Sequence, residues 1–301
     1  MPIWLVVNPR AGAGRGARVL SALLPLLRAE GAEPSVVHVC ADGDEPSRVT
    51  HAAVAQGADL VVAVGGDGHA AAVADALVGT GVTLAVVPGG SANDYARALG
   101  LREHRLRSLA RLIARARPQT VDVMRAEAAG RTRHVLTVGG SGFDAQVAGR
   151  AMAITRLRGA PRYVAAVLAE MPHYAPADFT IEVDGDRSDL PAMLVAVANG
   201  STYGGGMRVA PAAHLQSGSL EICIVGALSR LEFMRAFPSV FRGTHTAHSR
   251  VRMLRGQRVT ISADRPLGVI GDGERLGVLP ATFTVLPRAL SVIADPNAPM
   301  A

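Results

Sequence analysis

The sequence predicts two domains of different fold class, an α/β domain with a parallel sheet and a β-rich domain with an antiparallel, sandwich-like sheet. Three observations carry this prediction. Short apolar runs alternate with helical stretches over residues 1–124. From about residue 133 onward, short alternating strands are separated by turns. The chain has 301 residues, 49% of them hydrophobic, which is enough for two packed domains.

The first domain contains four apolar runs, IWLVV, SVVHV, LVVAV and TLAVV. Helices are expected between them, over about 14–30, 46–56 and 69–79. Each run ends in a turn rich in Gly, Asn, Asp or Pro. Because ligands of open α/β sheets bind beyond the carboxyl ends of the strands, we expect a binding site at these turns.

The second domain is expected to begin near Met124. Its predicted strands are HVLTVGG, DFTIEVDGD, AMLVAVANG, SLEICIV, RVTISAD, LGVIGDG and ATFTVLP. The interruptions at about 145–171 and 228–243 have an amphipathic helical pattern. No long flexible linker is expected between the domains, and the sequence has no internal repeat.

The net charge and the amino-acid composition limit the classes of molecule that this protein is expected to bind. The formal net charge is +6 and the pI is about 10.3, which favours an anionic partner such as ATP, nucleic acid or an anionic bilayer. All 31 basic residues are arginine, so a phosphate must be held by arginine, backbone amides or metal. Aromatic residues make up only 4%, which argues against base-stacking platforms for single-stranded nucleic acid, and no nucleic-acid partner is expected. The arginine-rich segment 101–117 is interpreted as the solvated face of a helix, with an anionic surface as the alternative.

The compartment predicted from the sequence is the cytosol. The apolar start of the chain breaks at Asn8-Pro9, too early for a signal peptide, and no segment is apolar enough to span a membrane. Cys40 and Cys223 are expected to be reduced core residues. His214, His245 and His248 are expected to be isolated surface side chains.

Two glycine-rich turns follow neighbouring strands. The run LVVAV leads into Gly65–Gly68 and a helix start near His69. Glycines let the backbone approach a phosphate, and a helix start offers unpaired amides and a favourable dipole. The run TLAVV leads into Pro88–Asp94, where Ser91 can donate to phosphate and Asp94 is available to metal-bound water. Two such turns predict a phosphate site, although an aspartate between glycines is also typical of a plain turn.

These turns resemble a known family. GGDG followed by PGGSANDYARALGL is similar to the diacylglycerol kinase catalytic fold of bacterial lipid kinases, sphingosine kinases and ceramide kinases. Further matches follow in the same order along nearly the whole chain. They are NPRAG, TVDVMRA, GGSGFDAQV, NGSTYGGGMRVAPAAHL and IGDGERL. NAD kinases also carry GGDG, so the ordered set of matches specifies the family better than that motif alone.

The resemblance implies a lipid kinase that uses ATP and Mg²⁺. Residues 1–124, completed by about 284–301, would form the nucleotide-binding domain, and residues 125–283 the lipid-substrate domain. ATP would lie in the cleft. The residues implied in binding it are Asn8, Cys40, Gly65, Gly66, Asp67, Gly68, His69, Ala70, Ala71, Gly90, Ser91 and Asn93.

The resemblance also implies the metal and catalytic residues. Asp67, Asp94 and Asp122 would hold Mg²⁺ largely through water, which suits a hard cation that keeps part of its hydration shell. Asp272 would be the general base on the lipid hydroxyl, with Glu274 supporting it or the metal. Asp67 is the alternative base, as in related sphingosine kinases. Phosphoryl transfer needs these groups because it depends on positioning and on neutralising oxygen charge.

Four positions depart from the family pattern. GGDG is followed by His69 and Ala72, where the family has threonine and glutamate. The imidazole is expected to replace the hydroxyl donor, whereas the glutamate has no substitute in that helix turn. Cys40 stands where relatives often have a nucleotide-contacting threonine, and Ser217 where many bacterial members have a metal-binding aspartate. An altered substrate or weak activity therefore stays open.

Two other functions also stay open, a kinase for a soluble substrate such as NAD and a non-catalytic nucleotide- or lipid-binding relative. Asn93-Asp94, in place of an asparagine-glutamate pair, argues against the first. Retention of all five predicted carboxylates argues against the second. The expected partners are a lipid substrate and an anionic membrane contacted peripherally, with a homodimer left open.

Overall fold

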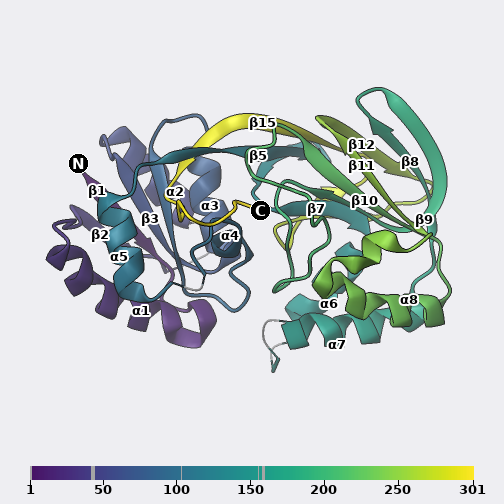
Figure 1. Ribbon diagram of the computed structural model, residues 1–301, viewed down its shortest axis with the longest axis horizontal. Helices are drawn as coiled ribbons and strands as arrows, with labels where there is room; N and C mark the ends of the chain where they lie inside the picture. The colour runs from purple at the N-terminus through teal and green to yellow at the C-terminus, as the bar shows by residue number, and fades with distance from the viewer. Residues whose placement is uncertain (1, 42–44, 103, 155, 158–159) are drawn as a thin grey trace. The chain divides into compact units, whose positions relative to one another are not determined.

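The computed structural model describes residues 2–41, 45–102, 104–154, 156–157 and 160–301. The chain divides into two compact units (Figure 1). Unit 1 contains Met1–Val123 and Pro287–Met300, and unit 2 contains Met124–Leu286 with Ala301. Within the described residues, we find no helix whose length and apolar character would let it span a membrane.

A parallel sheet forms the centre of unit 1. Its strands lie in the order β2-β1-β3-β4, and the end of β15 (Ala281–Val292) pairs in parallel with β4. Strands β1 and β3 are buried along their whole length, as expected for parallel strands. The strand bounds are β1 (Ile3–Val7), β2 (Val36–Val39), β3 (Leu60–Gly65) and β4 (Thr83–Pro88).

The helices of unit 1 pack in pairs, α1 with α5 and α2 with α3. Helix α1 (Ala11–Ala29) opens with a non-helical turn, in which Gly12, Ala13 and Gly14 all have positive φ. On α5 the leucine and isoleucine side chains point inward and the arginines outward, as the sequence predicted. The other helices are α2 (Glu45–Ala55), α3 (Asp67–Leu77), α4 (Asp94–Ala98) and α5 (Leu106–Arg115).

Unit 2 is built on antiparallel strands around the long strand β9 (Asp186–Ala198). The first half of β9 pairs with β8, and its second half pairs with β7 and β10. Inward-facing residues of β8, β9, β10, β12 and β15 form one apolar core. The remaining strands are β5 (Gln119–Ala128), β6 (Arg131–Val135), β7 (Val138–Gly142), β8 (Ala177–Val183), β10 (Leu220–Gly226), β11 (Val251–Gly256), β12 (Arg258–Ala263), β13 (Gly268–Gly271) and β14 (Glu274–Val278).

Three helices lie along one side of the strands of unit 2 (Figure 1). A second apolar core fills the space between them and the sheet. In it the ring of Phe143 makes edge contacts with Tyr174 and Phe233, each at 5.1 Å between centroids. The helices are α6 (Phe143–Ala153), α7 (Ala160–Glu170) and α8 (Arg230–Ala236), with short 3₁₀ turns η1 (Met171–His173), η2 (Phe237–Arg242) and η3 (Thr244–Ala247).

The predicted fold class is confirmed, and the differences lie in individual strands of unit 2. HVLTVGG was expected to be one strand, but β6 ends at Val135 and β7 begins at Val138. The intervening amides of Leu136 and Thr137 donate to the carboxylate of Asp272 and not to a neighbouring strand. Strands β5, β11 and β14 were not predicted. Strand β9 begins at Asp186, before AMLVAVANG, and β15 runs five residues beyond ATFTVLP, to Val292.

Candidate active site

The two predicted glycine turns of unit 1 lie against each other. The amide of Gly89 donates to the carbonyl of Gly65 at 2.7 Å. A Cβ on Gly90 would lie 2.5 Å from the Cα of Gly66, and one on Gly12 would lie 2.3 Å from the Gly89 oxygen. Only glycine permits such close backbone approach. The turns after β1, β3 and β4 therefore meet at one end of the parallel sheet, where open α/β sheets bind ligands.

The second turn is held in shape by Asn93. Its side chain accepts from the amide of Gly90 at 2.9 Å and donates to the Gly90 carbonyl at 3.0 Å. Asn93 itself has positive φ, a conformation that asparagine tolerates better than most residues. Ser91, at the tip of the turn, is exposed. Asn93 thus shapes the turn and occupies the Gly90 amide, and Ser91 is the exposed polar side chain at its tip.

Arg15 is a residue that the sequence analysis missed. Its guanidinium donates to the carbonyl of Gly90 at 3.4 Å, so a positive charge lies beside the second glycine turn. Arg10 is directed elsewhere, since its guanidinium donates to the carbonyl of Ala41 at 2.5 Å. The absence of lysine was the available signal, because it requires an arginine wherever a side-chain cation is to contact phosphate.

Asp67 and Asp94 are linked through the backbone. Asp67 opens α3, and its Oδ1 accepts from the amide of Tyr95 at 3.1 Å. Asp94 is buried at the start of α4, with the Arg97 guanidinium 3.6 Å from its Oδ1. Both carboxylates lie at helix starts, where the backbone dipole stabilises negative charge.

Asp122 has a different local partner. It is buried near the end of unit 1, and its Oδ1 accepts from the amide of Arg288 at 2.9 Å. Arg288 has positive φ, so this bond supports an unusual backbone turn in β15. The oxygens of Asp67, Asp94 and Asp122 do not lie within 4.8 Å of one another as a group that could bind one ion directly. Binding of Mg²⁺ through water, as predicted, would not need that spacing.

Cys40 lies beside other potential ligands. It is buried and reduced, as predicted. Among the described residues, a group of three side chains within direct metal-binding spacing is formed by His38, Cys40 and Glu45. The carboxylate of Glu45 already accepts from the amide of Ala41 and lies 2.7 Å from His38 Nε2. These contacts join the end of β2 to the first residue of α2.

His69 does not direct its donor toward the glycine turn. It is buried, and its Nε2 lies 2.9 Å from the carbonyl of Val6, to which it must donate. Burial lowers the pKa of the imidazole, with the bond to Val6 opposing this shift. The imidazole N–H that was expected to take the place of the threonine hydroxyl as a donor in the glycine turn thus donates to strand β1. The other ring nitrogen, Nδ1, can only accept a hydrogen bond.

In unit 2, Asp272 and Gly273 form a two-residue hairpin turn. Both have positive φ, and Gly271 pairs with Glu274 across the turn. An Asp-Gly pair is the usual sequence for such a turn, and this signal could have predicted β14. The Asp272 carboxylate accepts from the amide of Leu136 at 2.7 Å and from the Thr137 amide and hydroxyl at 2.9 and 2.6 Å.

The same carboxylate is the predicted general base. Burial raises the pKa of Asp272, and the hydrogen bonds from Leu136, Thr137 and Val138 oppose the shift. Desolvation and the nearby Asp272 charge raise the pKa of Glu274, while Arg133 opposes this. Asp272 Oδ2 accepts one of the three bonds and retains a lone pair that could accept a proton.

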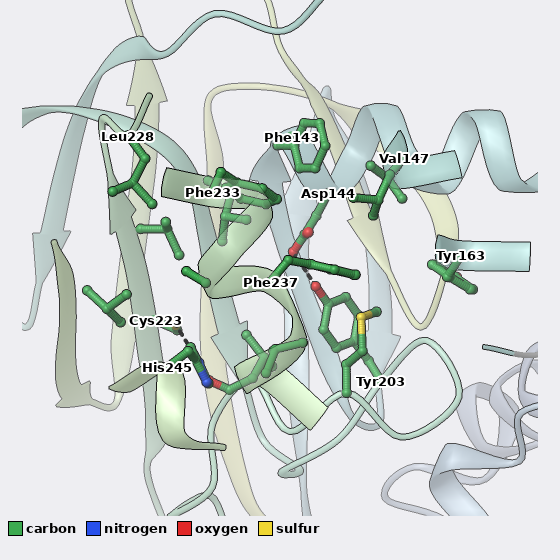
Figure 2. A pocket seen from close by; sticks show the side chains of 18 of the residues that line it. Phe143, Asp144, Val147, Tyr163, Tyr203, Cys223, Leu228, Phe233, Phe237 and His245 are labelled. Carbon is green, nitrogen blue, oxygen red and sulfur yellow. Dashed lines mark hydrogen bonds between the residues drawn. The ribbon is translucent and has the colours of Figure 1, made fainter. Parts of the chain in front are cut away.

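An apolar pocket lies between the helices and the sheet of unit 2 (Figure 2). It encloses about 790 Å³ of space, a figure that includes the part open to solvent. Gly273 of the hairpin turn belongs to its wall. The other lining residues are mostly aromatic or aliphatic, among them Phe143, Val147, Tyr163, Leu194, Phe233 and Phe237.

Four polar side chains in this wall were not assigned to a binding site from the sequence, namely Asp144, Tyr203, Cys223 and His245. Cys223 is buried and reduced, as expected. The hydroxyl of Tyr203 donates to Asp144 Oδ2 at 2.8 Å (Figure 2). Cys223 Sγ lies 3.8 Å from His245 Nε2, which is also 3.1 Å from the Val209 carbonyl. The expectation that His245 lies on the surface was wrong, because η3 packs it into the pocket wall.

Comparison with known proteins identifies the family. Residues 2–126 match the diacylglycerol kinase catalytic domain, and residues 137–294 match the YegS C-terminal NAD kinase beta sandwich-like domain. The chain belongs to the diacylglycerol kinase family. It is therefore a kinase, and members of a kinase family use ATP.

Relatives of this family member match over nearly its full length. A diacylglycerol kinase of Mycobacterium tuberculosis (strain CDC 1551 / Oshkosh) is 30% identical, covering 96% of this chain and 93% of the relative. A probable lipid kinase YegS-like of Stenotrophomonas maltophilia (strain K279a) is 27% identical over 91% and 90%. The crystal structure of a diacylglycerol kinase from Bacillus anthracis strain Sterne has the same fold, with a TM-score of 0.75, 22% identity and coverage of 98% and 97%.

Proposed function

We propose that this kinase transfers the γ-phosphate of ATP to the hydroxyl of a lipid alcohol at a membrane surface. The relatives named as diacylglycerol kinases make diacylglycerol the first candidate. One structural observation supports a lipid acceptor most directly, the apolar pocket whose wall includes Gly273. Because Gly273 lies between Asp272 and Glu274, a hydrocarbon chain in the pocket would hold its polar end close to both carboxylates.

The nucleotide half of the reaction is assigned to unit 1. The glycine turns offer backbone amides and close approach, Arg15 adds positive charge, and Ser91 adds an exposed hydroxyl. Asp67 and Asp94 are suited to hold the waters of a Mg²⁺ ion, with Asp122 as the third such carboxylate. When bound, Mg²⁺ would neutralise charge on the phosphate oxygens.

The lipid half of the reaction needs a proton acceptor at the hydroxyl. We assign this role to Asp272, whose Oδ2 has a lone pair available, and we keep Asp67 as the alternative. The three bonds from Leu136 and Thr137 fix the orientation of the Asp272 carboxylate. A fixed carboxylate helps because phosphoryl transfer depends strongly on positioning. Glu274 would support the charge at the same turn.

Membrane contact is assigned to the helical layer of unit 2. Leu231 and Met234, three positions apart on α8, are 58% and 41% exposed, while Phe233 on the same helix points into the pocket. Leu168 on α7 and Met152 on α6 are also about half exposed. Exposed arginines, Arg230 and Arg235, flank the α8 pair. Apolar and basic side chains together favour an anionic lipid surface.

A screen for phosphorylated lipid tests this function. The protein would be incubated with labelled ATP and a panel of lipid alcohols in mixed micelles, with NAD as a soluble acceptor. Labelled lipid product that depends on added Mg²⁺ is the expected result. Labelled NAD phosphate without lipid product would favour the soluble-substrate alternative. No labelled product from any acceptor would favour a non-catalytic relative.

A further inference from the structure

Three side chains of different ligand type lie together where β2 leads toward α2. His38 is on β2, Cys40 directly follows this strand, and Glu45 is the first residue of α2. One ligand atom from each, an imidazole nitrogen, the Sγ and a carboxylate oxygen, lies within 4.8 Å of the other two. The proposed phosphoryl transfer assigns no role to His38 or Glu45, so the reason for this grouping must be sought elsewhere.

The strand geometry directs two of these side chains to the same side. Residues two positions apart on a strand share a face, so His38 and Cys40 project together from β2. The opposite face carries Val37 and Val39, which are 40% and 49% exposed. The amide of Cys40 donates to the carbonyl of Val7 at 2.8 Å, which continues the pairing of β2 with β1 and fixes the backbone at the cysteine.

The third side chain is already directed at the first. The carboxylate of Glu45 lies 2.7 Å from His38 Nε2 through Oε1, and its Oε2 accepts from the amide of Ala41. Nitrogen and oxygen ligands of a tetrahedral zinc ion lie about 2.1 Å from the ion and therefore about 3.4 Å from each other. Side-chain shifts of about 1 Å would thus bring the three ligand atoms of His38, Cys40 and Glu45 around one ion.

Burial makes this place a pocket with one open side. Cys40 is 5% exposed and the side chain of Glu45 is 11% exposed, so water competes weakly for these two groups. The imidazole of His38 is 37% exposed, which leaves an entry path for an ion. A partly enclosed site with access from solvent is what a metal site requires.

The types of ligand decide which metal is suited to this site. Thiolate and imidazole are preferred by zinc and other late transition metals, whereas Mg²⁺ and Ca²⁺ prefer oxygen ligands. A thiolate and a carboxylate together carry two negative charges, which match the charge of Zn²⁺. They also limit repulsion from Arg48, whose guanidinium is 3.6 Å from Glu45 Oε1 and whose side chain is 74% exposed. Three protein ligands leave a fourth position for water, as in exchangeable zinc sites.

We propose that His38, Cys40 and Glu45 bind one Zn²⁺ ion. The site is chemically different from the magnesium site proposed at the aspartates of unit 1, because a thiolate discriminates against Mg²⁺. Bound zinc would join the end of β2 to the start of α2, and an ion that binds only the folded protein stabilises it. This inference goes beyond the proposed kinase function and does not depend on it.

Cobalt provides a direct probe of the cysteine ligand. The metal-free, untagged protein would be titrated with Co²⁺ under reducing conditions without added thiol, and its absorption spectrum recorded. A cobalt–thiolate bond gives a charge-transfer band in the near ultraviolet, which nitrogen and oxygen ligands alone do not give. We expect this band to saturate at one Co²⁺ per chain. Zn²⁺ should remove the band, since zinc binds such sites more tightly than cobalt, and millimolar Mg²⁺ should leave it unchanged.

Two single substitutions test the assigned ligands. Cys40→Ala should abolish the charge-transfer band and weaken Zn²⁺ binding by at least about a hundredfold, since even loss of an outer-shell partner costs about 10–100-fold. This variant keeps Cys223, so it also controls for the other thiol of the chain. His38→Gln should weaken Zn²⁺ binding by a similar factor. His51→Gln, which replaces an exposed histidine of α2, is its matched control and should bind Zn²⁺ as the wild type does.

Thermal unfolding with and without one equivalent of Zn²⁺ gives a second measurement. Zn²⁺ should raise the unfolding temperature of the wild type and of His51→Gln, and it should not raise that of Cys40→Ala. If Cys40→Ala does not fold, His38→Gln supplies the same test, because it changes a half-exposed side chain on the end strand of the sheet.

Two results would overturn the proposal. One is a folded wild type that gives no thiolate band with Co²⁺, and the other is a band and a Zn²⁺ affinity that survive unchanged in Cys40→Ala or His38→Gln. Neither measurement uses ATP or lipid, so the two proposals fail separately. Absence of lipid phosphorylation would leave the zinc site standing, and absence of zinc binding would leave the kinase function standing.

Discussion

The carboxylate of Asp67 accepts a hydrogen bond from the backbone amide of Tyr95, with 3.1 Å between Asp67 Oδ1 and the Tyr95 nitrogen. This bond joins the turn after β3 to the start of α4, where Asp94 is buried. Two of the three acidic residues predicted to share Mg²⁺ are thus fixed relative to each other by the fold of unit 1. The bond needs only an acceptor oxygen, whereas a metal needs the negative charge.

That distinction gives a prediction for Asp67→Asn. The amide oxygen of asparagine can still accept from Tyr95, so thermal stability should change little. Loss of the charge should remove most turnover, because Mg²⁺ binds carboxylates strongly and amides weakly. Asp59→Asn, an exposed aspartate next to the other end of β3, is the matched control and should behave as wild type. Unchanged turnover of folded Asp67→Asn would remove Asp67 from the metal site.

Gly90→Ala should disrupt the contact between the glycine turns. The new Cβ would lie 2.5 Å from the Cα of Gly66, so the backbone must move. We expect a loss of about 1–3 kcal/mol in unfolding free energy and at least tenfold weaker ATP binding by calorimetry. Gly149→Ala, inside α6 with open space around it, should instead be neutral or slightly stabilising. Wild-type ATP affinity in Gly90→Ala would exclude the turn from the nucleotide site.

The parallel sheet of unit 1 could be predicted because each strand and helix carries a local signal. The apolar runs and the glycine turns that follow them are contiguous in sequence, and the structure has them within a few residues of the expected bounds. Unit 2 was less predictable. The interruption of HVLTVGG at Leu136 arises from the carboxylate of Asp272, more than a hundred residues away. No local pattern contains that information.

The candidate site residues also fall into those with a local sequence signal and those brought together only by the fold. The glycine turns and their aspartates were found because they form contiguous motifs. Asp144, Tyr203 and His245 come from three separate segments, and their proximity follows from the packing of α6 and η3 on the sheet. The Asp-Gly pair at Asp272 was interpreted only as a source of catalytic carboxylates. It is also a local signal for a hairpin turn, and it joins β13 to β14.

The pH dependence of stability should reveal the buried carboxyl of Asp144. Burial raises its pKa from 3.8 to about 6, and the Tyr203 hydrogen bond partly opposes this. The titratable groups that interact with this carboxyl are Tyr174, Tyr203 and Cys223. All three stay neutral between pH 4 and pH 7, because their pKa values lie well above this range. Between pH 3.8 and about pH 6, the unfolded and folded pKa values of Asp144, the folded state binds more protons than the unfolded state. The contribution of Asp144 to stability therefore falls as pH rises through this range.

Asp144→Asn removes that contribution. Relative to wild type, the variant should gain up to about 3 kcal/mol in unfolding free energy between pH 4 and pH 7, from a pKa shift of about two units. Urea titrations of both proteins at several pH values measure the difference. A difference that does not change with pH would mean that the carboxyl titrates with an ordinary pKa.

Membrane contact should depend on the exposed face of α8. Leu231→Glu combined with Met234→Glu should weaken binding to anionic vesicles by at least about tenfold, because each large side chain contributes roughly 1.5–3 kcal/mol when buried in an apolar phase. Val278→Glu on β14 replaces a similarly exposed apolar side chain elsewhere in unit 2 and should have little effect. Wild-type binding should also fall as salt screens the arginines. Equal binding to neutral and anionic vesicles at all salt concentrations would contradict this assignment.

The base assignment needs a test that separates chemistry from the hairpin turn, because Asp272 serves both. Asp272→Asn should lower lipid phosphorylation by about two to four orders of magnitude, the usual contribution of a general base, and leave ATP affinity unchanged. It should also destabilise unit 2 by about 1–3 kcal/mol, since an asparagine NH₂ would face the amides of Leu136 or Thr137.

Thr137→Val is the control for that structural effect. It removes the 2.6 Å bond from the Thr137 hydroxyl and keeps the Asp272 carboxylate and both backbone bonds. The expected loss of stability is about 0.5–1.5 kcal/mol, with turnover within about tenfold of wild type. If turnover falls equally in both variants, the role of Asp272 is to hold the turn, and Asp67 becomes the leading candidate for the base. If only Asp272→Asn loses turnover while its ATP affinity is retained, the carboxylate itself takes part in the proton transfer.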